Sequence, residues 1–237
     1  MSKEDIKLSV EEMEKSGVNF GHKVSKLHPK MKPYVSGMKN GVHIFDLEKT
    51  SKEFEKALIF ISKIVSEGKS IIFVGTKIQL KAIIKDAADQ CGIPCVTERW
   101  LGGTFTNFET IQKRVNYFKD LEKKKETGEL EKYTKKERLN FDREIAKLKV
   151  KFDGIRNMLK LPEAVFIFGL DKDLTCAKEA KRKGIKIISI VDTNVDPDIV
   201  DYLIPANDDA ISSVRYILEK VKDAIINSKQ IVKDSKS

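Results

Sequence analysis

The most unusual group of side chains in this sequence lies in a basic stretch between residues 15 and 45. It holds six lysines and no acidic residue. All three histidines of the chain also lie there: His22, His28 and His43. Lysines hold phosphate groups, and the interleaved rings of Phe20 and Tyr34 can stack on nucleotide bases. The histidine spacings match no metal-binding motif, so this stretch favours nucleic-acid contact over a metal site.

A second candidate is a group of aspartates, Asp192, Asp196 and Asp198, that follows an apolar run. Aspartates in this position can bind a divalent ion or serve as catalytic acids in α/β enzymes. We favour the alternative that Asp192 and Asn194 shape a turn and that Asp196 caps a short helix beginning at Pro197. No residue stands in a nucleophile motif. We therefore expect no catalytic residue, metal, cofactor or small-molecule substrate.

The turn after the first core strand is the place where many α/β proteins bind a nucleotide. Here it reads Val74-Gly75-Thr76-Lys77, with a single glycine. Neither a dinucleotide-binding nor a phosphate-loop motif is present, which argues against a nucleotide-dependent enzyme that uses the aspartates. Lys77, at a helix N-terminus, could instead meet a phosphate of a larger polyanion.

A third candidate is the 99–107 loop, which contains the only tryptophan and a glycine pair. One interpretation is a hinge, in which Gly102 and Gly103 turn the chain while Trp100 and Phe105 pack beneath it. The functional interpretation adds groups that can contact an RNA backbone: Arg99, Thr104, Thr106 and Asn107. The two interpretations are compatible.

An α/β core must position these groups, and we expect it in residues 51–105 and 160–228. Apolar runs predict strands at 70–75, 93–97, 164–169, 185–191 and 202–204. Amphipathic stretches predict helices at 50–67, 77–90, 174–183 and 207–227. Strand–helix–strand units with short joints imply a parallel sheet flanked by helices. We expect an N-terminal helix and basic arm in residues 1–50 and a frayed tail in residues 229–237.

Residues 106–159 interrupt this alternation. Apolar residues recur every three or four positions, first at Phe108, Ile111, Val115 and Phe118, then at Phe141, Ile145, Leu148, Phe152, Ile155 and Leu159. A period of 3.5 is typical of a coiled coil. Because Gly128 separates the two stretches, the sequence predicts an antiparallel coiled-coil hairpin inserted into the core.

The composition favours a protein with a polyanionic partner and argues against a membrane or secreted protein. The 237 residues carry 45 Lys+Arg and 36 Asp+Glu, a net charge of +9. This balance favours a polyanionic partner, although a soluble protein with a basic pI is the alternative. Apolar runs are far shorter than the ~20 residues of a membrane span, and no secretory signal is visible. We expect a cytoplasmic location, with an organelle interior as the alternative, and no membrane partner.

Eight motifs appear in order along the chain: Gly17-Val-Asn-Phe-Gly-His22, His28-Pro-Lys-Met-Lys-Pro-Tyr34, Asn40-Gly-Val-His-Ile-Phe-Asp-Leu-Glu-Lys-Thr50, Phe73-Val-Gly-Thr-Lys77, Arg99-Trp-Leu-Gly-Gly-Thr104, Ile190-Val-Asp-Thr-Asn194, Asp196-Pro197 and Ile204-Pro-Ala-Asn-Asp-Asp-Ala-Ile211. Together they closely resemble the bacterial and organellar small-subunit ribosomal protein S2 family, from about residue 10 to residue 226. In that family the first motif more often reads G-V-H-F-G-H, and here Asn19 replaces the first histidine. The W-N-P of many members is Leu27-His28-Pro29.

The resemblance implies a flavodoxin-like core with a protruding coiled coil, in a structural and non-catalytic protein of the small ribosomal subunit. It implies binding to small-subunit rRNA where the head meets the body, late assembly, and recruitment of neighbouring ribosomal proteins, including the large first protein. A scaffold that mainly binds those proteins is an alternative to direct RNA binding. The residues expected to bind rRNA are Phe20, His22, Lys23, Lys26, Lys30, Lys32, Tyr34, Lys39, Asn40, Arg99, Gly102, Gly103, Thr104, Thr106 and Asn107.

Overall fold

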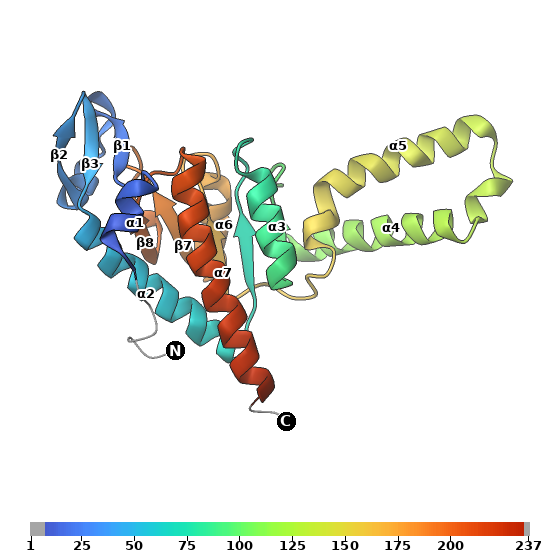
Figure 1. Ribbon diagram of the computed structural model, residues 1–237. Coiled ribbons are helices and arrows are strands. Elements are labelled where there is room, and N and C mark those ends of the chain that lie inside the picture. The colour runs from blue at the N-terminus through green and yellow to red at the C-terminus, as the bar shows by residue number, and fades with distance from the viewer. Residues whose placement is uncertain (1–7, 235–237) are drawn as a thin grey trace.

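Short apolar strands form the centre of the protein in a computed structural model that describes the backbone of residues 8–234 and the side chains of residues 8–230. They are β4 (Ile71–Val74), β5 (Cys95–Val96), β6 (Ala164–Ile167), β7 (Lys186–Val191) and β8 (Tyr202–Pro205). All pair in parallel, in the order β5-β4-β6-β7-β8. Counted from β4 this is the order 2-1-3-4-5 of flavodoxin-like folds, so the predicted α/β fold class is confirmed (Figure 1).

The two faces of this sheet are covered differently. Helices α2 (Leu47–Ser66), α3 (Lys81–Cys91) and α7 (Ile211–Asp234) pack on the face that carries Phe73, Phe166 and Ile190. Helix α6 (Leu174–Lys183) packs on the other face, against Val165 and Ile167. Because both faces are covered, the strands read as continuous apolar runs rather than as alternating patterns.

Three of the expected helix starts were wrong. Helix α2 begins at Leu47 rather than at residue 50, because Asp46 caps it there. Helix α3 begins at Lys81, four residues after the expected Lys77, because the intervening residues form a turn. Helix α7 begins at Ile211 rather than Asn207, whose side chain accepts hydrogen bonds from the backbone of Asp209 and Ala210. The same helix continues to Asp234, through most of the expected frayed tail, and residues 235–237 lie outside the described residues.

The basic arm contains regular structure. After α1 (Val10–Lys15), it contains a small antiparallel sheet of β1 (Phe20–Lys23), β3 (Val42–Phe45) and β2 (Val35–Lys39), in the order β1-β3-β2. The 3₁₀ helices η2 (Val24–Lys26) and η3 (Pro29–Tyr34) connect β1 to β2. Asn40 and Gly41, with φ of 52° and 76°, form the turn of the β2–β3 hairpin, as Asn-Gly pairs commonly do.

The insertion consists of α4 (Phe108–Glu126), η4 (Glu129–Lys132), α5 (Lys135–Phe152) and η5 (Asp153–Ile155). The two long helices run antiparallel and extend away from the sheet (Figure 1). The side chains of Val115 and Phe118 are fully buried, and Ile145 is nearly so. Leu159, expected on the same seam, is 83% exposed because α5 ends at Phe152. Coiled-coil supercoiling of the pair stays a prediction.

Candidate nucleic-acid interface

The arm is fixed to the core at the carboxyl edge of the parallel sheet. The backbone N–H of His22 donates to Oγ1 of Thr193 at 2.9 Å, and that of His28 donates to the Thr193 carbonyl at 2.7 Å. A side chain on Gly21 would place its Cβ only 2.6 Å from the methyl group of Thr193. Glycine at this position therefore allows β1 to lie directly against the loop that follows β7.

The imidazole of His22 faces the core rather than solvent. Its Nδ1 lies 3.1 Å from the buried carboxylate of Asp192, and its Nε2 lies 3.5 Å from Asp209. The hydrogen bond to Asp192 raises the pKa of His22 above its usual range, against the opposing effect of burial. Both ring nitrogens are thus used to dock the arm, and stacking of His22 on a nucleotide is disfavoured in this arrangement.

The arm lysines fall into two groups. Lys30 pairs with Asp196 at 3.1 Å and with Asp198, and these hydrogen bonds, with Asp198 foremost, raise its pKa. The other candidates are exposed, and among the described residues none of them forms an ion pair: Lys23, Lys26, Lys32 and Lys39. The structure therefore gives Lys30 a docking role and leaves the other four amines facing solvent.

The three remaining arm candidates lie near these lysines in the chain. Phe20 in β1 is 44% exposed, so one surface of its ring faces solvent. Tyr34 at the end of η3 is half-buried, and burial raises the pKa of its hydroxyl. Asn40 is exposed at the β2–β3 turn.

The aspartates after β7 serve the fold. The carboxylate of Asp196 accepts a hydrogen bond from the backbone of Asp198 and caps η6 (Pro197–Ile199). The carboxylate of Asp192 accepts hydrogen bonds from the backbone and the hydroxyl of Thr193. The expected roles of Asp192 and Asp196 are thus confirmed, whereas the side-chain oxygen of Asn194 is buried and has no hydrogen-bond partner among the described residues. Across the described residues, no group of three or more His, Cys, Asp or Glu side chains is placed to hold a metal ion.

Lys77 occupies the crevice where flavodoxin-like folds usually bind ligands. Its side chain is 6% exposed, and its amine lies 2.7 Å from Asp208 and 2.8 Å from Asp209. Burial lowers the pKa of Lys77, but the charges and hydrogen bonds of Asp208, Asp209 and Asp171 together outweigh this effect and raise it. Burial also raises the pKa of Asp208, to about 7. The expectation that Lys77 meets an external phosphate is therefore wrong.

The 99–107 loop wraps around a buried carboxylate on α6, that of Glu179. The backbone N–H groups of Gly103, Phe105 and Thr106 donate to it at 2.8, 3.0 and 3.1 Å. The Thr106 hydroxyl donates at 3.1 Å and the Trp100 indole at 3.2 Å. Burial alone would raise the pKa of Glu179, but these hydrogen bonds lower it below its usual range. The carboxylate therefore stays charged and fixes the loop to the core.

The contacts with Glu179 divide the expected RNA-binding residues of the 99–107 loop into those that hold the loop in place and those that face solvent. Thr104 is 2% exposed, and its hydroxyl donates to the Leu101 carbonyl at 2.7 Å, while the amides of Gly103 and Thr106 are taken by Glu179. These groups hold the loop in place, which supports the hinge interpretation. Four loop candidates are exposed: Arg99, Gly102, Thr106 and Asn107. Of these, Thr106 already donates both its amide and its hydroxyl to Glu179. Sequence reasoning missed Glu179, although a lone acid on the inner face of an amphipathic helix is a recognisable signal.

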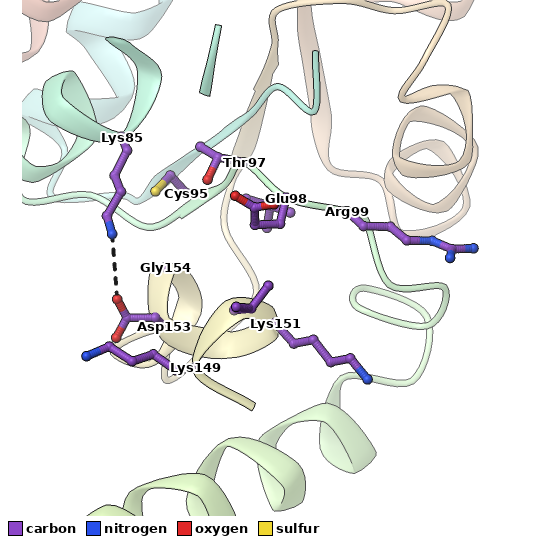
Figure 2. Close-up of a pocket in the computed structure, with 11 residues that line it drawn as sticks. Lys85, Cys95, Thr97, Glu98, Arg99, Lys149, Lys151, Asp153 and Gly154 are labelled. Atoms are coloured by element: carbon purple, nitrogen blue, oxygen red, sulfur yellow. Dashed lines mark ion pairs between the residues drawn. The ribbon is translucent and has the colours of Figure 1, made fainter. Parts of the chain in front are cut away.

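A shallow pocket of about 310 Å³ lies where the hairpin meets the core. Figure 2 shows the charged side chains that line it, which are the cations of Lys85, Arg99, Lys149 and Lys151 and the carboxylates of Glu98 and Asp153. Lys85 and Asp153 are 4.0 Å apart. A Cβ on Gly154 would lie 2.0 Å from the Cys95 carbonyl oxygen, so this glycine allows the hairpin base to pack against β5. The pocket therefore lies at the joint between the hairpin and the core, and cations outnumber carboxylates in its lining.

The amino-acid sequence was compared with protein families and with proteins of known name. The family model for ribosomal protein S2 matches residues 13–228. A protein of Roseiflexus sp. (strain RS-1), "Small ribosomal subunit protein uS2", is 46% identical over 219 residues, which cover 92% of this chain and 84% of the relative. A protein of the same name from Chloroherpeton thalassium (strain ATCC 35110 / GB-78) is 46% identical over 227 residues, covering 96% and 91%.

The family match spans the arm, the core and the inserted hairpin, which are the parts that position the candidate residues. None of the helices in the described part of the chain is long and apolar enough to cross a membrane. Two relatives share nearly half of their residues with this chain over most of its length. The chain therefore belongs to the ribosomal protein S2 family, whose members are structural proteins rather than enzymes.

Proposed function

We propose that this protein is a structural component of the small ribosomal subunit that binds small-subunit rRNA at the junction of head and body. Family membership supports the ribosomal assignment. The observation that carries direct RNA binding is the docked arm, which presents four exposed lysines that have no ion-pair partner among the described residues: Lys23, Lys26, Lys32 and Lys39. Lysines of this kind neutralise backbone phosphates.

Docking makes this binding surface rigid before RNA arrives. The contacts of His22 and Lys30 with core aspartates hold the arm, so less conformational entropy is lost on binding. Phe20 offers a ring surface for stacking, and Tyr34 and Asn40 offer polar groups. His22 and Lys30 thus act as docking residues that position the RNA-facing ones.

The 99–107 loop supplies the second part of the proposed interface. Arg99, Gly102 and Asn107 are exposed and available to phosphate or ribose groups. Gly103, Thr104 and Thr106 hold these three in place through Glu179 and Leu101. In a bacterium the site of action is the cytoplasmic ribosome, and in an organelle it is the ribosome made there.

Salt-dependent binding tests the RNA proposal. The variant K23Q/K26Q/K32Q removes three arm charges, and K52Q/K63Q/R215Q removes three exposed charges from α2 and α7 as a matched control. Three phosphate contacts correspond to a decrease of about 2 in the slope of log affinity against log salt. We expect this decrease for the arm variant alone, measured by filter binding to a full-length small-subunit rRNA transcript. Wild-type binding that does not change with salt would contradict direct RNA binding.

A scaffold role has its own support in the hairpin. Helix α5 exposes Leu139 (49%) and, beside the pocket at the hairpin base, Val150 (61%). Exposed apolar side chains are typical of protein contacts. We propose that the hairpin binds neighbouring ribosomal proteins, the large first protein among them, late in assembly. The variant L139S/V150S should reduce the amount of those proteins on purified subunits and leave rRNA affinity unchanged. Loss of rRNA affinity in this variant would argue against separate roles.

A further inference from the structure

Helix α6 carries a row of cations that neither the sequence motifs nor the arm and loop account for. Four of its exposed residues are cations: Lys178, Lys181, Arg182 and Lys183. The opposite side of the helix is buried through Cys176, Ala177, Glu179 and Ala180. All four cations therefore face solvent on the same side of the sheet.

These cations lie between the two proposed RNA-binding segments. On one side, the Lys181 amine donates to the Asp198 carbonyl at 3.5 Å, and the carboxylate of that same Asp198 pairs with Lys30 of the arm. On the other side, Glu179 of α6 holds the 99–107 loop. Helix α6 thus connects segments that are about seventy residues apart in the chain (residues 30 and 99).

The hydrophobic core supports the same placement. Met31 and Phe45 of the arm, Trp100 and Phe105 of the loop, and Ala177 of α6 belong to one buried cluster on one face of the sheet. Helices α2, α3 and α7 cover the opposite face. The arm, α6 and the loop therefore share one face of the protein.

Neighbouring carboxylates do not neutralise this row. Asp196 and Asp198 pair with Lys30, and Asp201 pairs with Lys186 at 2.7 Å. Lys178, Arg182 and Lys183 form no ion pair with any described residue. Cations at a helix C-terminus also stabilise the helix through its dipole. That effect is confined to the last turn and does not account for Lys178.

The surface fits RNA better than a protein partner. No large apolar side chain is exposed on α6 within the described residues, whereas the hairpin exposes Leu139 and Val150. Protein interfaces usually need an apolar centre, whereas a phosphodiester backbone needs only cations and hydrogen-bond donors. The guanidinium of Arg182 can also bind a phosphate through two hydrogen bonds.

We propose that Lys178, Arg182 and Lys183, which we call the α6 ridge, bind the phosphodiester backbone of RNA and connect the arm to the 99–107 loop in one continuous interface. This inference rests on the proposed function, because the RNA it names is small-subunit rRNA. The α6 ridge would add a third set of RNA contacts to those of the arm and the 99–107 loop. Because its three cations stand on one helix, their backbone positions are fixed relative to one another.

The test compares two triple variants, each of which removes two lysines and one arginine. K178Q/R182Q/K183Q removes the α6 ridge, and K52Q/K63Q/R215Q removes exposed cations from α2 and α7. Binding of each full-length protein to a small-subunit rRNA transcript is measured between 50 and 300 mM KCl, roughly the range in which counterion release dominates. We expect the ridge variant to lose about tenfold in affinity and about 2 in salt slope, and the control to stay near wild type.

Equal behaviour of the two variants, with the arm variant still weakened, would overturn the α6 ridge alone. Salt-independent binding by the wild-type protein would instead overturn the proposed function. A ridge variant with normal rRNA affinity but fewer neighbouring proteins on purified subunits would assign the surface to an acidic protein. A tethered cleavage reagent on K178C should also cut rRNA near the bound protein, whereas one on K63C should not. Thermal unfolding of each variant confirms that its fold is intact.

Discussion

The arm and the 99–107 loop look alike as sequence but attach to the core in opposite ways. Both are rich in groups that bind anions. In the arm, cationic side chains of His22 and Lys30 reach carboxylates of the core. In the loop, backbone amides of Gly103, Phe105 and Thr106 surround a carboxylate that the core supplies. In both regions, some of the groups that could bind an external anion instead bind a carboxylate of this protein.

The difference lies in burial and in the number of hydrogen bonds. Glu179 is 6% exposed and accepts five hydrogen bonds. The His22 side chain is 21% exposed and Lys30 is 48% exposed. The cost of losing a buried, charged hydrogen-bond partner is much larger than that of losing an exposed ion pair. The loop should therefore depend on one residue, whereas the arm depends on several weak contacts.

Removal of Glu179 is the most severe test of this comparison. Glu179→Ala leaves the buried donors of Phe105 and Trp100 and the half-buried donor of Gly103 without their partner. We expect a loss of about 3 to 5 kcal/mol in the free energy of unfolding, measured by urea denaturation. Glu219→Ala, at an exposed position on α7, is the control and should change stability by less than about 0.5 kcal/mol. A loss of similar size in both variants would refute the anchoring role.

Two glycines, Gly154 at the hairpin base and Gly21 in the arm, allow close backbone packing against the core at two different places. Gly154→Ala places a Cβ 2.0 Å from the Cys95 carbonyl oxygen at the hairpin base. Gly21→Ala places one 2.6 Å from the Thr193 side chain at the arm. We expect losses of about 1 to 3 kcal/mol in the free energy of unfolding, with Gly154→Ala the larger because a backbone atom cannot rotate away. Gly37→Ala, which meets nothing within 4 Å, serves as the control.

The two anchors should respond to pH in opposite directions. The pKa of His22 is raised by Asp192, so its contribution is complete below its usual pKa of about 6.5 and is lost as pH rises through the higher folded value. The pKa of Glu179 is lowered by its hydrogen bonds, so its contribution is present above about 4.5 and is lost as pH falls through the lower folded value.

The measurement compares the difference in stability between wild type and each variant. Burial raises the pKa of Asp208, which lies near His22, to about 7, so the stability of the wild type alone would also reflect Asp208. The difference between wild type and His22→Gln should shrink from pH 6 to pH 8.5. The difference between wild type and Glu179→Gln should shrink as pH falls below about 4.5. A His22→Gln difference that grows with pH would show that a neutral imidazole docks the arm.

The smallest expected effect is a change in the salt dependence of rRNA binding, which should differ between a docking lysine and an RNA-binding lysine. Lys32 is exposed, and the described residues offer it no ion-pair partner, whereas Lys30 pairs with Asp196 and Asp198. Lys32→Gln should lower the salt slope of rRNA binding by about 0.7 to 0.9, the value for one phosphate contact. Lys30→Gln should leave that slope unchanged. A decrease in slope for Lys30→Gln would mean that its ion pairs open when RNA binds.

The sequence predicted most elements of the core fold, but it did not predict which candidate residues are free to bind RNA. Apolar runs such as residues 164–169 and the periodicity of 174–183 predict elements that the structure contains, because burial on both sides leaves a strong local signal. Strand β1 was missed because Phe20–Lys23 shows no alternation and depends on pairing with β3. Likewise, which cations are free depends on partners far along the chain. Lys30 meets Asp196, and Lys77 meets Asp208, and no local pattern predicts either contact.

The docking of the arm also sets an order of events during synthesis. The arm is made early, but its contacts are with Thr193 and with the backbone of Asn207, which follow more than a hundred and fifty residues later. Strand β4 likewise waits for β6, because Ile71 pairs with Ala164. The helices of the hairpin need only local contacts and can form while the chain is still growing. The arm therefore reaches its final position only after the last core strand has been made, and a truncated chain cannot present it.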